Sequence, residues 1–132
     1  MTNKLEGIFQ ITGWDETSYF EDENDAKQSN AIITQRYTGD IEGNSSLQYL
    51  MSYQSKNSAR FVGFEIVTGT VAGKNGSIVI QHNGTFENGV ASSKFSIVEK
   101  SGKGELENIT GSGSFKSGEN GQAAYTLETN FV

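Results

Sequence analysis

Hydrophobic and polar residues alternate along most of this chain, in short runs separated by groups of glycine, asparagine and serine. Alternation with a period of two is typical of β-strands, because successive side chains of a strand point to opposite faces of the sheet. No run shows the i, i+3, i+4 spacing of an amphipathic helix over three turns. The pattern therefore predicts an all-β protein with strands near residues 4–14, 31–38, 46–54, 59–71, 77–86, 90–98, 111–117 and 123–132.

A weak internal repeat indicates that these strands follow one another as hairpins. A glycine is followed two residues later by an aliphatic residue at Gly39–Ile41, Gly69–Val71 and Gly104–Leu106, and the chain is expected to reverse near each copy. A meander of eight twisted strands removes its exposed edges most easily by closing on itself. We therefore expect an antiparallel eight-stranded closed barrel, with residues 1–132 forming a single domain.

The segment Asp15–Ser29 is the one long polar stretch, rich in Asp and Glu and without clear periodicity. A calcium-binding loop would need oxygen ligands at alternate positions followed by a glycine, and Ala26 falls where a ligand should be. We therefore predict a solvated loop or a short helical turn here.

The pair Asn88-Gly89 predicts which side chains of two strands share a face. Asn-Gly is a strong signal for a two-residue type I′ turn, and directly opposed residues of antiparallel strands point to the same side. The turn therefore sets His82 opposite Phe95 and Ile80 opposite Ile97.

The preceding reversal, expected within Gly73–Gly76, leaves three registers open. A four-residue loop sets Val67 opposite His82 and makes Glu65 and His82 diagonal neighbours. A two-residue turn at Asn75-Gly76 keeps the parity but separates this pair by two more pleats. A three-residue loop would put Glu65 and His82 on opposite faces.

One face of the predicted sheet collects most of the apolar side chains and is expected to be the core. A five-residue loop at Gln54–Ser58 would set Leu47 opposite Glu65 on that face. The predicted interior comprises Phe9, Ile11, Leu47, Tyr49, Met51, Glu65, Val67, Val71, Ile78, Ile80, His82, Phe86, Phe95, Ile97, Tyr125, Leu127 and Phe131.

The carboxylate of Glu65 and the imidazole of His82, the single histidine, thus share an apolar interior. Such a pair can remove a proton from a bound organic molecule and return it elsewhere, so both are predicted catalytic residues. The alternative is an internal polar pair without chemistry. An eight-stranded barrel can also hold one small ligand. The expected ligand-binding residues are Trp14, Leu47, Tyr49, Val67, Ile80, Phe95 and Tyr125, with Trp14 either capping the ligand or plugging the barrel.

Composition excludes several classes of function. The chain has no cysteine, which removes disulfides, thiol nucleophiles and thiolate metal sites, and one histidine poorly supplies a transition metal. We expect no metal and no cofactor. A net charge of −6 with scattered basic residues argues against nucleic acid as a partner. No membrane span or secretion signal is recognisable, so a cytoplasmic location is expected.

Five stretches carry a resemblance to a known family: GIFQITGW (7–14), YTGDIEGNSSLQYLMSY (37–53), FVGFEIVTGTVAGKNGSIVIQHNGTFENG (61–89), SGKGELENITGSGSF (101–115) and YTLETNF (125–131). Together they resemble small uncharacterised bacterial proteins, a domain of unknown function whose fold is similar to the allene oxide cyclase barrel. The resemblance implies a cavity like that of plant cyclases, which fold an unsaturated fatty-acid epoxide. Those enzymes act mainly by steering substrate conformation beside an internal glutamate, with which Glu65 is comparable.

These observations predict a protein that binds a small, largely apolar molecule inside a barrel, as an isomerase or cyclase using Glu65 with His82. The alternative is a structural or interaction protein whose barrel is filled by side chains and whose function lies on the outer surface or at an oligomer interface. Phe64 and Ile66 are apolar on the outward parity and would serve such a contact. A homodimer or homotrimer is expected.

Overall fold

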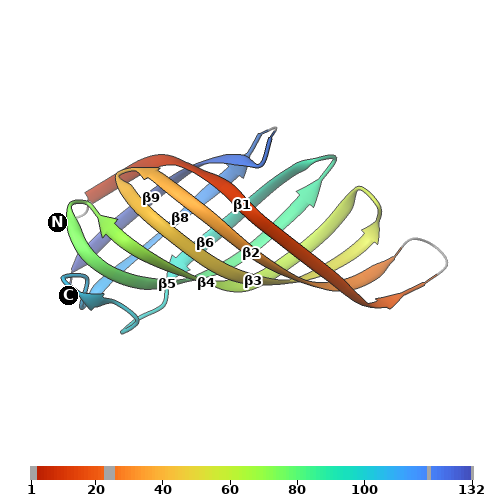
Figure 1. The fold of residues 1–132 in the computed structure, drawn as a ribbon, viewed down its shortest axis with the longest axis horizontal. Helices are drawn as coiled ribbons and strands as arrows, with labels where there is room; N and C mark the ends of the chain where they lie inside the picture. Colours follow the sequence, from red (N-terminus) through yellow and green to blue (C-terminus); the bar gives the residue numbers. More distant parts are fainter. Residues whose placement is uncertain (1–2, 23–25, 119, 132) are drawn as a thin grey trace.

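The computed structural model describes residues 3–22, 26–118 and 120–131, in which the chain forms nine β-strands joined largely by tight turns (Figure 1). No helix is present in these residues, and so none that could cross a membrane. The strands are β1 (Asn3–Glu21), β2 (Lys27–Gly39), β3 (Ile41–Ser55), β4 (Ser58–Val71), β5 (Lys74–Glu87), β6 (Val90–Ile97), β7 (Lys103–Gly104), β8 (Ile109–Ser117) and β9 (Gln122–Phe131).

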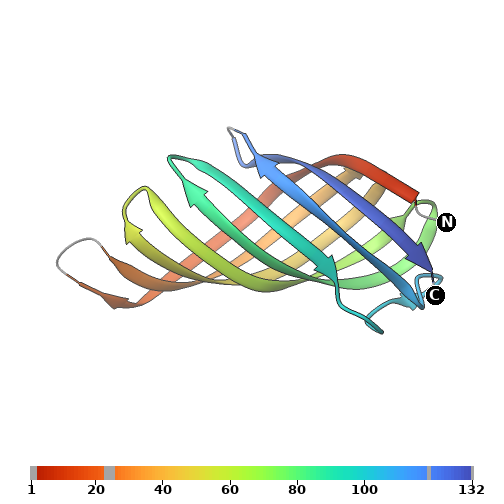
Figure 2. The ribbon, with the colours of Figure 1, turned by 180° about the vertical axis from the view of Figure 1, so that it is seen from behind.

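Eight of the strands form a ring in which every pairing is antiparallel. Going around it, the order is β1, β2, β3, β4, β5, β6, β8 and β9, and β9 pairs back with β1. Figure 2 shows β6, β8 and β9 from behind, on the side opposite β2 and β3. The predicted antiparallel all-β architecture is therefore confirmed as an eight-stranded ring.

The short strand β7 was not predicted, because its residues lie in a glycine-rich stretch that we interpreted as turn. It pairs with β5 at Gly76 and Ser77. A Cβ atom on Gly76 would collide with the carbonyl oxygen of Lys103, so glycine at this position lets the two backbones approach. The loop that carries β7 also inserts Leu106, which is fully buried, into the core at this end of the ring.

The prediction of a loop over Asp15–Ser29 is wrong. β1 continues to Glu21, and β2 begins at Lys27, directly opposite it. The two strands form a long hairpin that extends beyond the rest of the ring (Figure 1); residues 23–25 lie outside the described residues. Because this hairpin reaches past the core, both of its faces are largely polar, and the alternation that marks a strand is missing.

The predicted position of the β4–β5 reversal is also wrong. The turn consists of Ala72 and Gly73, with φ angles of 51° and 80°, rather than any loop ending at Gly76. In the observed register Glu65 lies opposite Ile80. The pairing differs from the four-residue and two-residue registers by an even number of residues, so their shared parity holds and His82 is diagonal to Glu65. The three-residue alternative, which put the two side chains on opposite faces, is excluded.

The other two predicted registers of this sheet are confirmed. Asn88 and Gly89 both have positive φ, as a type I′ turn requires, and His82 lies opposite Phe95. Leu47 lies opposite Glu65 as expected. The β3–β4 loop is shorter than predicted, because Ser55 pairs directly with Ser58 after an irregularity in the strand.

The interior of the ring is the core, and most of the predicted inward residues are buried there. Three of the residues predicted to be inward are less buried than expected. Ile11 and Phe86 are only partly buried, and Phe131 is 37% exposed because it lies at the last position of β9. Among the described residues, the buried polar side chains are few and are gathered largely around one position, Glu65.

Candidate functional site

The structure brings the two predicted catalytic residues into direct contact inside the ring. Glu65 lies on β4 and His82 on β5, and Oε1 of Glu65 is 2.6 Å from Nε2 of His82. Both residues are buried, with Glu65 at 0% and His82 at 2% exposure. The contact follows from the diagonal register, which places the two side chains on the same face within reach of each other.

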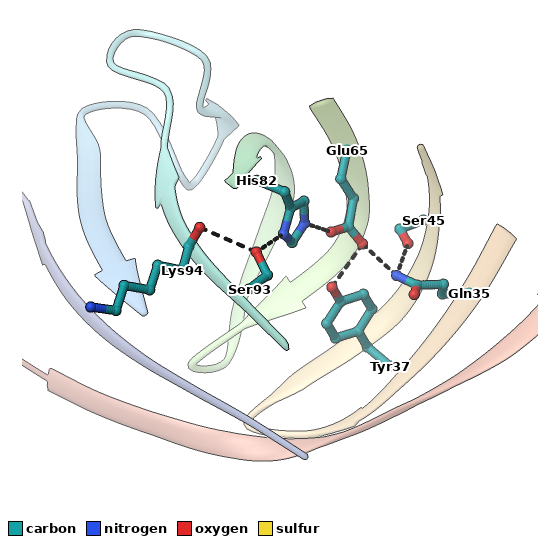
Figure 3. A network of polar contacts seen from close by, with 7 residues as sticks. All are labelled: Gln35, Tyr37, Ser45, Glu65, His82, Ser93 and Lys94. Atoms are coloured by element: carbon teal, nitrogen blue, oxygen red, sulfur yellow. Dashed lines mark hydrogen bonds and ion pairs between the residues drawn. The ribbon is translucent and has the colours of Figure 1, made fainter. Parts of the chain in front are cut away.

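The second oxygen of Glu65 is held by side chains from β2. Its Oε2 atom accepts hydrogen bonds from the hydroxyl of Tyr37 at 2.7 Å and from Nε2 of Gln35 at 2.9 Å (Figure 3). Gln35 Nε2 also donates to Oγ of Ser45 on β3 at 3.4 Å. Both carboxyl oxygens of Glu65 thus have hydrogen-bond partners within the protein.

The other nitrogen of His82 is tied to β6. Nδ1 lies 3.0 Å from Oγ of Ser93, and that hydroxyl donates to the carbonyl oxygen of Lys94 at 3.1 Å. The Ser93 hydroxyl thus lies within hydrogen-bond distance of both Nδ1 and the carbonyl oxygen of Lys94. Together with the contact between Nε2 and Oε1 of Glu65, it holds both nitrogens of the imidazole in place.

Aromatic rings enclose the imidazole of His82. Tyr49, Phe95 and Phe115 meet it at steep angles, with ring centroids 5.5, 5.3 and 5.6 Å away respectively. Gly63, directly opposite His82 on β4, makes room for this arrangement, because a Cβ atom there would lie 2.8 Å from Cδ1 of Tyr49. The rings exclude water and hold the imidazole in one orientation.

The two phenols nearest Glu65 stay protonated over the ordinary pH range. Burial is the main cause that raises the pKa of Tyr37 well above 10, and the negative charge of Glu65 and the hydrogen bond to it add to the effect. Burial and the charge of Glu65 likewise raise the pKa of Tyr49. Both hydroxyl groups therefore remain hydrogen-bond donors.

A cavity of about 250 Å³ opens beside this network, at the end of the ring that carries the β5–β6 and β8–β9 turns. Its lining is mainly apolar and includes Phe9, Ile33, Met51, Phe61, Phe86 and Phe115. Two members of the lining, Gln35 and Tyr49, reach back to the network. Among the described residues, no Asp, Glu, Lys, Arg or His lines this cavity.

The predicted ligand-binding residues divide into two groups. Trp14, which is 47% exposed, and Tyr49 line the cavity. The other five, Leu47, Val67, Ile80, Phe95 and Tyr125, are buried and do not line it. Tyr125 instead stabilises the β2–β3 turn, where its hydroxyl donates to the carbonyl oxygen of Thr38 and accepts from the amide of Ile41.

Sequence reasoning missed four polar members of the network: Gln35, Tyr37, Ser45 and Ser93. The alternation of residues 31–38 does place Gln35 and Tyr37 on the same parity as buried Ile33, which is a usable signal. Ser45 and Ser93 carry no signal beyond parity. No group of three or more His, Cys, Asp or Glu side chains that could hold a metal ion occurs in the part of the chain that the structure describes.

Comparison with known proteins places the chain in a family. A crystal structure of a protein of unknown function from the DUF3224 family of Shewanella oneidensis MR-1 superposes with a TM-score of 0.79. The two are 27% identical, over 100% of this chain and 99% of that one. No curated protein matches. Residues 5–129 match the family described as "Protein of unknown function (DUF3224)", and the chain therefore belongs to the DUF3224 family.

Proposed function

We propose that the chain binds one small, largely apolar molecule in the cavity beside Tyr49, with a neutral polar group of that molecule directed at Gln35 and Tyr49. The observation that carries the proposal is a mainly apolar hollow, open at one end of the ring, with two polar side chains at its inner wall. Binding sites for small molecules typically combine such a lining with a few placed polar groups.

The hydrogen bonds already made by Gln35 define what its amide can offer a ligand. Its Nε2 atom is engaged by Glu65 and Ser45, and Oε1 accepts no hydrogen bond from the described residues. Oε1 is therefore an acceptor, and the hydroxyl of Tyr49 is a donor or acceptor. The hydroxyl group of an alcohol can donate to Oε1 of Gln35 and form a second hydrogen bond with the hydroxyl of Tyr49. A carboxylate finds no cation in the lining and lies near the charge of Glu65.

In this proposal Glu65 and His82 position the binding groups and do not touch the ligand, because neither lines the cavity. Glu65 orients Gln35, and the imidazole of His82 packs against the ring of Tyr49. An isomerase or cyclase that acts by holding its substrate in one conformation needs only such a shaped site. The catalytic form of the proposal is therefore an isomerase or cyclase activity in a barrel like that of allene oxide cyclase.

The emission of Trp14 offers a direct test, because it is the only tryptophan and lines the cavity. The protein is titrated separately with hexanol, hexanoate and hexane. Hexanol should change the emission at a lower concentration than either of the other two probes. Ala91→Leu, which adds three heavy atoms to the cavity wall, should abolish the change. Ala124→Leu, on the exposed face of β9, is the matched control and should leave it intact.

Two results would overturn the proposal. One is an emission that none of the three probes alters in the wild-type protein. The other is an Ala91→Leu variant that responds like the wild type, which would locate the response outside the cavity. A stronger response to hexanoate than to hexanol would retain the cavity but contradict the neutral polar group.

A further inference from the structure

We infer that the outer face of β2, β3, β4 and β5 is the contact surface between two copies of this chain, which associate as a two-fold homodimer. The face carries a groove of about 650 Å³ on the outside of the ring. It is separate from the interior cavity, and the inference stands independently of the proposed function.

The groove is lined by large apolar side chains that a lone chain leaves in water. Ile32, Leu50, Val62, Phe64 and Ile66 are each between 49% and 55% exposed. They are contiguous, since Leu50 lies directly opposite Val62, and Phe64 and Ile66 follow on the same face of β4. Patches of this kind mark contacts with another macromolecule, because covering them removes apolar surface from water.

The charges on this face suit a second copy of the chain. The polar residues in the groove are uncharged: Asn30, Ser46, Gln48 and Gln81. Charged residues on the same outer face, Arg36, Glu42, Arg60 and Glu87, lie toward the ends of the four strands. A chain of net charge −6 repels its own copies, so a contact between copies requires a face whose centre has no charge. The two arginines and two glutamates at the strand ends cancel, so this face has no net attraction for an acidic or a basic partner, whereas a second copy brings charges of both signs to the edges of the contact.

The geometry favours two copies over three. A two-fold contact uses one patch on both partners, whereas a ring of three needs two different complementary patches on each copy. The groove is a single continuous patch on one side of the ring. Of the homodimer and homotrimer expected from the sequence, the proposal therefore adopts the dimer.

Sedimentation and native mass spectrometry of the full chain test the inference. The wild type should have twice the mass of the 14.3 kDa chain at micromolar concentration. Leu50→Glu should lower it to 14.3 kDa, because each copy would bury an unpaired carboxylate in the apolar contact. Ile8→Glu makes the same change at an exposed isoleucine of β1 outside the groove and should remain dimeric.

The absence of cysteine permits a second readout that does not depend on a disruptive variant. A Ser46→Cys thiol should react with a maleimide more slowly as the protein concentration rises, whereas an Ile8→Cys thiol should react at a constant rate. A wild type that is monomeric throughout, a trimer, or equal protection of the two thiols would overturn the inference. A monomer that captures a different protein through this face would also overturn it.

Discussion

The Nε2 atom of His82 lies 2.6 Å from Oε1 of Glu65, in a part of the ring that water does not reach. Such a pair has its strongest consequence when one partner is removed, because the other is left buried without compensation. Glu65→Gln should therefore destabilise the protein by about 3 kcal/mol. Urea denaturation measures this loss of stability. The control is Glu42→Gln, at an exposed position of β3, which should change the free energy of unfolding by less than about 0.5 kcal/mol.

The double variant Glu65→Gln/His82→Gln separates the contact from the packing of each residue. If the two side chains act together, its loss should fall short of the sum of the single losses by about 0.5–3 kcal/mol. Purely additive losses would mean that the pair contributes nothing beyond the separate side chains.

Alkaline pH should destabilise the protein through Tyr37. Its pKa is raised in the folded state above the ordinary value of 10, mainly by burial and further by Glu65. The phenol therefore contributes stability that is fully present below pH 10 and is lost as the pH rises from 10 toward the folded-state pKa. The free energy of unfolding of Tyr37→Phe should fall less steeply above pH 10 than that of the wild type. Identical slopes would contradict this assignment.

Acid pH should act on the long β1–β2 hairpin through Glu16. Burial alone would raise the pKa of Glu16, but hydrogen bonds from Ser29 at 2.5 Å and Trp14 at 3.1 Å lower it below 4.5. The stabilisation is present above pH 4.5 and is lost as the pH falls through the folded-state pKa. Glu16→Gln should weaken the dependence of stability on pH in this range. Thermal unfolding measured from pH 4.5 down to below the folded-state pKa would show the weaker dependence. The same pH dependence in Glu16→Gln and the wild type would contradict this role of Glu16.

Gly63 should not tolerate a side chain, since it lies opposite His82 beneath the ring of Tyr49. A Cβ atom would collide with the carbonyl oxygen of Gln48 and lie 2.8 Å from Tyr49. We expect Gly63→Ala to cost about 1–3 kcal/mol, as overpacking usually does, and to alter the near-ultraviolet circular dichroism of the aromatic residues. Gly118→Ala has open space around the new methyl group and should be neutral.

The turns show where local sequence was sufficient. Asn88-Gly89 determined its own hairpin, because few residues adopt two successive positive φ angles as readily. The β4–β5 reversal offered several glycines, and local preference did not distinguish them. In the structure the turn lies at Ala72-Gly73, and Gly76 instead belongs to β5, where it pairs closely with β7.

The alternation of apolar and polar residues by itself determined most of the strands and their antiparallel succession, but not the hairpin of β1 and β2 beyond the core, β7, or the turn that sets the parity of Glu65 against His82. It did not determine which inward polar groups meet. Tyr37 and Gln35 bond to Glu65 although β2 and β4 are not neighbours in the sheet. That contact exists because the sheet closes into a ring, and its curvature brings inward side chains from separated strands together. Only the tertiary structure could decide it.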